Sequence, residues 1–156
     1  MIIISHRGNL DGVCPEKENT LEYIQEAIDS GYDVEVDLRV KDGGLYLGHD
    51  TPDHAVTPQW LEERSENLWI HVKDYKALVW LTSQDHKFMY FCHESDTYCL
   101  TSNGYIWSHD TENDMSELCI VPLLDLRSVE GFSQTNFHAV CSDFAHKCHD
   151  KFKKEH

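Results

Sequence analysis

The sequence is poor in basic residues. Thirteen lysines and arginines face 28 aspartates and glutamates among the 156 residues, so the formal net charge at pH 7 is −15. A surface with this excess of negative charge repels the phosphates of nucleic acids and of anionic lipid membranes. The composition therefore argues against nucleic-acid binding and against adsorption to an acidic membrane. An anionic substrate is expected to bind only where a cation and local basic groups reverse the field.

Long hydrophobic runs are also missing. The opening run Ile2-Ile3-Ile4 is too short for a signal peptide or a membrane span, and no later stretch is long enough to span. We therefore expect a cytoplasmic protein without a membrane span. The six cysteines show no CxxC spacing, and without an export signal we expect buried free thiols rather than disulfides.

Several widespread functional motifs are absent as well. The chain has no glycine-rich phosphate loop, no GxSxG sequence and no HExxH sequence. It also lacks a linker, a repeat or a low-complexity segment. With 40% hydrophobic and 26% charged residues, the chain is long enough to bury a core of its own. We therefore expect a single domain over residues 1–156.

Short apolar segments alternate with connecting segments along the chain. Eight of these segments are predicted to be strands: Ile2–Ser5, Asp33–Val40, Leu45–His49, Leu68–Lys73, Phe88–Cys92, Tyr105–Ser108, Cys119–Leu124 and Ala139–Asp143. Helices are expected mainly in the first half of the chain, over Asn19–Ser30, from Pro58 onward, and over Tyr75–Thr82. The alternation predicts an α/β fold with a parallel sheet that closes as a barrel.

The ends of these elements carry recognisable signals. Asn19 is expected to cap the first helix and Gly31 to end it. Thr57 is the expected N-cap of the second helix, with Pro58 in its first turn. The run Asp42-Gly43-Gly44 predicts a tight turn between two strands.

The predicted strand Asp33–Val40 alternates strictly between apolar and charged residues. Val34, Val36, Leu38 and Val40 share one face, and Asp33, Glu35, Asp37 and Arg39 share the other. An edge strand with a solvated acidic face explains this pattern as well as a buried site does. If the sheet is a barrel, however, Glu35 and Asp37 point inward, and buried carboxylates require a cation. Two such carboxylates suit a hard divalent ion with oxygen ligands.

Two histidines follow predicted strands directly. His6-Arg7-Gly8 ends the first strand, and His49-Asp50 ends the third. Either histidine alone is more often an ordinary surface or core residue. Together they would lie at the carboxyl ends of barrel strands, where active sites form. Two imidazoles there could relay protons, and Arg7 offers a guanidinium for phosphate oxygens.

These motifs resemble the signature of glycerophosphodiester phosphodiesterases, which are barrel proteins of the phospholipase-C-like phosphodiesterase type. The resemblance covers roughly the first third of the chain and rests on His6-Arg7-Gly8, Pro15, Glu18-Asn19-Thr20, Glu35-Val36-Asp37 and His49-Asp50. Further on it is weaker: Val140–Phe144 is similar to the family's last barrel strand.

The resemblance implies a fold and an activity. The fold would be a reduced (β/α)8 TIM-like barrel, and the activity would be the hydrolysis of a glycerophosphodiester to glycerol phosphate and an alcohol. His6 and His49 would be the catalytic acid–base pair. Glu35 and Asp37 would bind a divalent metal ion, usually calcium or magnesium. Arg7 would contact the phosphate and Glu18 would support the first motif.

The sequence departs from the family pattern in three places. Glu16-Lys17 interrupt the usual Pro-Glu-Asn-Thr run. In the fourth strand Lys73 matches the family's phosphate-binding lysine, but His71 stands where a third metal-binding glutamate is usual. Imidazole favours transition metals such as manganese, iron or zinc over calcium. His71 therefore either ligates such an ion or leaves a weaker site. The family's insertion after the third strand is nearly absent, so the cover over the substrate must be small.

The chain is short for a barrel of eight βα units, which typically takes about 250 residues. Loops would have to replace several outer helices. The barrel surface left uncovered would be apolar, and a homo-oligomer that covers it is expected.

Other candidate residues carry weaker signals. His146, Cys148 and His149 could bind zinc, but a polar tail through Lys151 and Lys154 is the better interpretation. His93-Glu94 is interpreted equally well as part of the cavity mouth and as a plain loop. Trp107 either walls the pocket or belongs to the core.

The sequence thus predicts a metal-dependent phosphodiesterase that acts on a small-molecule phosphodiester. Two alternatives remain open. One is a lipid-headgroup lyase of the sphingomyelinase D type, which shares the histidines and the Glu-x-Asp pattern. The other is a non-catalytic barrel that binds phosphoesters, which the His71 departure and the short chain favour.

Overall fold

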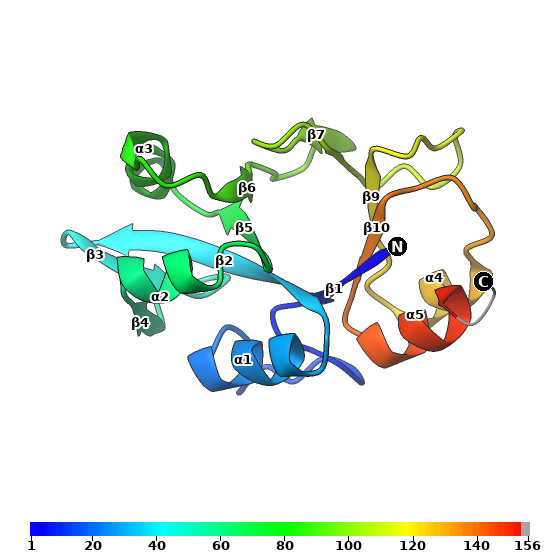
Figure 1. Ribbon diagram of the computed structural model, residues 1–156, viewed down its shortest axis with the longest axis horizontal. Helices are drawn as coiled ribbons and strands as arrows, with labels where there is room; N and C mark the ends of the chain where they lie inside the picture. Colours follow the sequence, from blue (N-terminus) through cyan, green and yellow to red (C-terminus); the bar gives the residue numbers. More distant parts are fainter. Residues whose placement is uncertain (154–156) are drawn as a thin grey trace.

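The computed structural model describes residues 1–153, and in this range the chain forms one mixed sheet of ten strands with five helices (Figure 1). The strands are β1 (Ile2–His6), β2 (Asp33–Lys41), β3 (Gly44–Leu47), β4 (His54–Val56), β5 (Leu68–Val72), β6 (Met89–Phe91), β7 (Tyr98–Leu100), β8 (Ile106–Ser108), β9 (Cys119–Pro122) and β10 (Ala139–Ser142). The helices are α1 (Leu21–Asp29), α2 (Pro58–Glu63), α3 (Tyr75–Ser83), α4 (Leu126–Gly131) and α5 (Ala145–Phe152). Each of the eight predicted strands overlaps an observed one.

Most of the sheet is parallel. Across residues 1–153 the parallel strands run in the order β6-β5-β2-β1-β10-β9-β8. Strand β2 is long enough to pair twice along one edge, first with β1 and then with the antiparallel hairpin β3–β4. At the other end, β7 turns back antiparallel to β8. The α/β class and the parallel sheet are therefore confirmed.

The prediction of a (β/α)8 barrel is wrong in one respect, because the sheet curls but does not close. In the described part of the chain no ladder joins β6 to β7 or β8. Ser102 forms hydrogen bonds across this seam: its N–H donates to the carbonyl of Tyr90, and its hydroxyl accepts from the Tyr90 N–H. The segment between β6 and β9 supplies a short hairpin where a closed barrel needs complete βα units, so there is too little chain to finish the ring.

The helices lie outside the curl of the sheet (Figure 1). Helices α1, α2 and α3 pack on the outer face around Val34, Val36 and Leu38. Helices α4 and α5 cover the other half, where Ala145, Cys148 and Phe152 are buried. A third cluster fills the inside of the curl: Ile4, Trp69, Phe91, Trp107, Ile120, Ala139 and Cys141.

Local sequence signals predicted the cap of α2 and the end of α1 correctly, but they assigned the N-cap of α1 to the wrong residue. The N-cap of α1 is Thr20, whose hydroxyl accepts from the Tyr23 N–H, and not Asn19 as expected. Thr57 caps α2 as predicted, since its hydroxyl accepts from the Trp60 N–H. Gly31 follows α1 with φ of +89°, a left-handed conformation that ends a helix and that glycine adopts without strain.

The C-terminal segment was predicted to be a polar tail, and this prediction is wrong for the described residues. Ala145–Phe152 is helix α5. Its buried residues recur at spacings of three and four, which is the period of a helix face packed on a sheet. The polar residues between them lie on the outer face. Lys154 lies outside the described residues.

The cysteines are free thiols with different surroundings. Cys119, Cys141 and Cys148 are buried as expected, Cys14 and Cys99 are half-buried, and Cys92 is exposed. Burial raises the pKa of Cys141 well above its usual value, so this thiol stays protonated and unreactive. In residues 1–153 no helix combines the length and the apolar character that crossing a membrane requires.

Candidate metal centre and cavity

The carboxylates of β2 point into the curl of the sheet. Glu35 is 1% exposed and Asp37 is fully buried. Their orientation follows from the alternation of the strand, because Val34 and Val36 occupy the opposite face under the helices. The prediction of inward-facing acids is confirmed, and the alternative of a solvated acidic face is wrong.

Asp37 is held on one side by Asn19 and Arg7. The Asn19 amide donates to Asp37 Oδ2 at 2.9 Å, and its carbonyl accepts from the Asp37 N–H at 3.0 Å. The Arg7 Nε lies 3.1 Å from the same Oδ2. Burial raises the pKa of Asp37, but the adjacent His71 imidazole, the Asn19 hydrogen bond and the charge of Arg7 outweigh burial and hold the pKa well below its usual range. Asp37 is therefore a carboxylate at neutral pH.

Glu35, Asp37 and His71 form a group that could hold a metal ion. Their ligand atoms all lie within 4.8 Å of one another. His71 Nδ1 lies 3.3 Å from Asp37 Oδ1 and 3.6 Å from Glu35 Oε1. Asp37 Oδ1 and Glu35 Oε2 are buried without a hydrogen-bond partner. A buried carboxylate oxygen without a partner is costly, and a bound cation would satisfy it.

His71 is oriented by two contacts on its far side. Its ring stacks on Phe91 with centroids 4.9 Å apart, and its Nε2 lies 2.8 Å from the carbonyl oxygen of His93. Burial lowers the pKa of His71, but its close contacts with the Asp37 and Glu35 carboxylates outweigh burial and raise it to about 9. The site thus attracts positive charge at the point between the two carboxylates.

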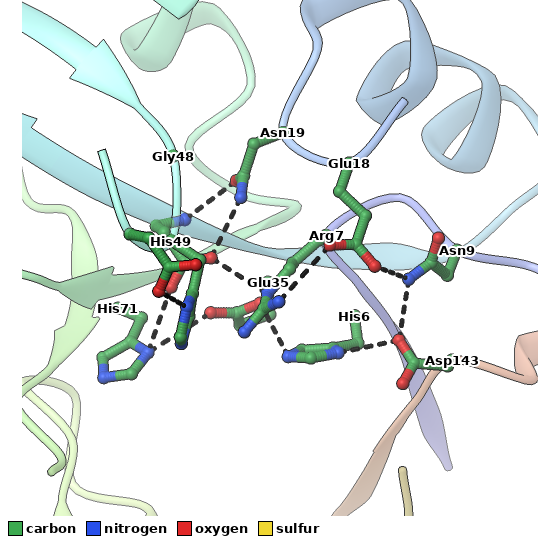
Figure 2. Close-up of polar contacts among 12 residues, drawn as sticks. His6, Arg7, Asn9, Glu18, Asn19, Glu35, Gly48, His49, His71 and Asp143 are labelled. Carbon is green, nitrogen blue, oxygen red and sulfur yellow. Dashed lines mark hydrogen bonds and ion pairs between the residues drawn. The ribbon is translucent and has the colours of Figure 1, made fainter. Parts of the chain in front are cut away.

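His6 lies on the other side of Glu35 (Figure 2), where it pairs with a carboxylate that the sequence analysis did not select. His6 Nδ1 is 2.7 Å from Asp143 Oδ1, and its Nε2 is 3.7 Å from Glu35 Oε2. Burial lowers the pKa of His6, but the Asp143 hydrogen bond and the Glu35 charge raise it above its usual value. Asp143 also accepts from Asn9 Nδ2 at 2.7 Å. The signal for Asp143 was its place at the end of the last predicted strand.

The turn after β1 positions Arg7 and Glu18. Arg7 NH1 lies 3.3 Å from Glu18 Oε2, and Asn9 donates to Glu18 Oε1 at 2.8 Å (Figure 2). Arg7 has φ of +57° and Gly8 has φ of +96°. A Cβ on Gly8 would lie 2.7 Å from Tyr23 Cδ1, so the turn requires glycine there. Glu18 thus holds Arg7 and Asn9 in this turn.

One cavity of about 400 Å³ collects most of the predicted site residues. His6, Arg7, Glu35, His49, His71 and Lys73 all line it. Asp37 is buried beside it and Glu18 holds Arg7 from outside it. Arg39 positions His49 by donating hydrogen bonds to the carbonyls of Gly48 and His49. The Nδ1 of His49 lies 2.8 Å from Asp50 Oδ1.

The opposite wall of the cavity is aromatic. Phe91 and Trp107 stack with centroids 4.1 Å apart, and His93 and His109 stack at 4.5 Å. Glu94 adds one carboxylate to this wall. Burial lowers the pKa of His109, which favours its neutral form. His93, Glu94 and Trp107 thus line the mouth, and His109 is a wall residue that the sequence analysis missed.

The weaker zinc candidate near the C-terminus is not supported. Cys148 lies on the buried face of α5, and His146 Nδ1 pairs with Asp11 Oδ1 at 2.9 Å. Among residues 1–153, the metal-capable group is Glu35, Asp37 and His71. Comparisons of this chain with protein-family models, with curated proteins and with solved structures find no match.

Proposed function

We propose that this protein is a metal-dependent phosphodiesterase that hydrolyses glycerophosphodiesters to glycerol phosphate and an alcohol. One observation carries the proposal: the buried group Glu35, Asp37 and His71, with unsatisfied carboxylate oxygens, opens on a cavity that also contains His6 and His49. The order of the motifs along the chain, which resembles glycerophosphodiester phosphodiesterases, supports the same activity.

Glu35, Asp37 and His71 are the residues that would hold the divalent ion. When bound, such an ion polarises a phosphoryl oxygen and offsets charge that develops in the transition state. The unsatisfied oxygens Asp37 Oδ1 and Glu35 Oε2 fit this requirement, and so does His71 Nδ1, which lies 3.3 Å from Asp37 Oδ1.

Arg7 and Lys73 supply the positive charge of the protein itself. Both line the cavity. Asp37 and Glu18 hold the Arg7 guanidinium in place, so it is preorganised toward a phosphate instead of being ordered on binding. In a chain with a net charge of −15, these two cations and the metal group make the cavity a local exception that can take an anion.

His6 and His49 would move the protons. Asp143 fixes Nδ1 of His6, which leaves Nε2 on the side of Glu35 and the cavity. In this position His6 can accept a proton from the attacking hydroxyl, either from a water or from the substrate's own glycerol. His49 is less buried, with a side chain 40% exposed, and can deliver a proton to the leaving oxygen at the solvent side.

The test is an assay of glycerophosphocholine and bis-para-nitrophenyl phosphate with magnesium, calcium, manganese or zinc added in turn. We expect turnover in the wild type and a loss of about 100-fold or more in His6→Ala and His49→Ala. His86→Ala is the matched control, because His86 is exposed and contacts Ser65 outside the cavity. Equal activity in all four proteins would refute the assignment of the two histidines.

The products separate the alternatives. Release of a cyclic phosphate from a lysolipid, with no glycerol phosphate from glycerophosphodiesters, would favour a headgroup lyase. Tight binding of a phosphodiester without turnover under any of the four metals would favour a non-catalytic barrel.

A further inference from the structure

The surroundings of His71 carry information on which ion the site takes. The Nε2 of this ring faces the carbonyl oxygen of His93 at 2.8 Å. A carbonyl oxygen only accepts hydrogen bonds, so Nε2 carries the proton and donates it. In the neutral ring the lone pair is then on Nδ1, which faces Asp37 and Glu35. A lone pair aimed at two carboxylates is repelled, so either a proton on Nδ1 or a metal cation must lie between them.

Metal-binding histidines typically show this arrangement. A ligating imidazole almost always donates its other N–H to a carbonyl or a carboxylate, which fixes the ring and its tautomer. Here the His93 carbonyl fixes Nε2 and Phe91 fixes the ring plane, since the two rings are inclined by only 12°. His71 is thus preorganised to bind through Nδ1.

The carboxylates complete the group. Asn19 and Arg7 engage Asp37 Oδ2 and leave Oδ1 buried and unpaired toward His71. The distances of 3.3 and 3.6 Å from Nδ1 to the nearest oxygens suit a small ion. Two ligand atoms bound to one zinc-sized ion at about 2.1 Å each lie about 3 to 3.5 Å apart.

We propose that this site selects a transition-metal dication such as manganese, iron or zinc over magnesium and calcium, with Nδ1 of His71 as a ligand. The inference deepens the proposed function and rests on its metal-binding part. Magnesium and calcium take mainly oxygen ligands, and calcium needs six to eight of them. One imidazole with two carboxylates is a mixed nitrogen and oxygen set, which favours transition ions.

The test measures binding without reference to activity. Untagged, metal-free protein is titrated with manganese, zinc, magnesium and calcium, and the dissociation constants are compared. We expect manganese and zinc to bind more tightly than magnesium and calcium by on the order of 10- to 100-fold, the range that metal-site changes typically span. His71→Glu should narrow or reverse this preference. His86→Glu, the same substitution at an exposed histidine outside the cavity, should leave it unchanged.

An NMR spectrum of the wild type tests the inference even if the His71→Glu variant fails to fold. Nitrogen NMR of the imidazoles should show Nδ1 of His71 shifting on addition of zinc while Nε2 keeps its proton. Tighter binding of magnesium or calcium by the wild type, an unchanged preference in His71→Glu, or zinc at Nε2 would overturn the inference. Transition-metal binding without turnover would refute only the proposed function, and turnover restricted to magnesium or calcium would refute only this inference.

Discussion

Asp143 reaches His6 from the far end of the chain, and the proposed proton transfer depends on this contact. It lies directly after β10, which pairs in parallel with β1, so the register brings the two residues together. Together with His6 it forms a histidine–carboxylate pair in which Asp143 positions the ring and raises its pKa.

Replacing this carboxylate should change His6 in a measurable way. In Asp143→Asn we expect the pKa of His6 to fall, because burial then acts without the carboxylate's charge, and kcat to fall by about 100-fold or more. An NMR titration of His6 and a pH–rate profile measure both effects. Asp11→Asn removes the acid of another histidine–aspartate pair, exposed at His146, and serves as the matched control. An unchanged titration midpoint of His6 would contradict the role of Asp143.

Metal affinity should depend on pH through His71. Its pKa of about 9 in the metal-free protein lies above the ordinary 6.5. The proton on His71 therefore stabilises the metal-free fold fully below about pH 6.5, and this stabilisation is lost as the pH rises through 9. A metal ion must displace that proton, so affinity should rise about tenfold per pH unit below 9. Titration with manganese at pH 6, 7 and 8 tests this, and a constant affinity over that range would contradict it.

At the scale of elements, the turn between β1 and α1 should tolerate little change at Gly8. Gly8→Ala should lower the free energy of unfolding by about 3 kcal/mol, because a left-handed backbone and a contact with Tyr23 both oppose a Cβ. Gly104→Ala is the control: its φ of +89° is similar, but its Cβ would meet no atom within 4 Å. We expect about 1 kcal/mol there. Urea denaturation measures both, and equal losses would contradict the role of the Tyr23 contact.

The sequence predicted elements well where one physical signal dominated. The strict alternation of Asp33–Val40 and the cap at Thr57 were both assigned correctly. Asn19 was misassigned because a helix cap and a clamp on Asp37 require the same kind of side chain, and only the fold shows which contact forms. Helix α5 was missed because lysines, histidines and an aspartate separate its three buried residues, so the helical spacing of those three is not evident in the sequence. Strands β4 and β7 are too short for a pattern of period two to stand out.

At the scale of the whole molecule, the sequence could suggest a curled parallel sheet but could not show whether it closes. Closure depends on whether β6 pairs with β7 or β8, and the residue pattern within a strand does not show which strand it pairs with. The candidate site was predictable in outline because its residues lie within or directly after strands whose ends meet around one cavity. Asp143, Asn9 and His109 were not selected because their roles arise from partners distant in sequence.

The open seam should be visible in hydrogen exchange. The carbonyl of Thr97 and the N–H of Thr101 form hydrogen bonds on the β8 side of β7. The amides of Tyr98 and Leu100, which alternate with these residues, therefore point away from β8 and toward the seam. We expect these amides to exchange much faster than those of β1 and β10, which have neighbours on both sides. Exchange measured residue by residue by NMR tests this. Equal protection at β7 and β1 would contradict an open sheet.

At the seam near Ser102 the described sheet is open, whereas a closed barrel would be a continuous ring of paired strands. His71 in β5 and His109 directly after β8 lie on opposite walls of the cavity, and the series of paired strands that connects β5 to β8 runs through β2, β1, β10 and β9. We expect that a small bend shared among these strands would widen or narrow the distance between the two walls without breaking a ladder. The width of the cavity should therefore depend on how side chains such as His93 and His109 stack across the seam, and ligands of different size could fit within one fold.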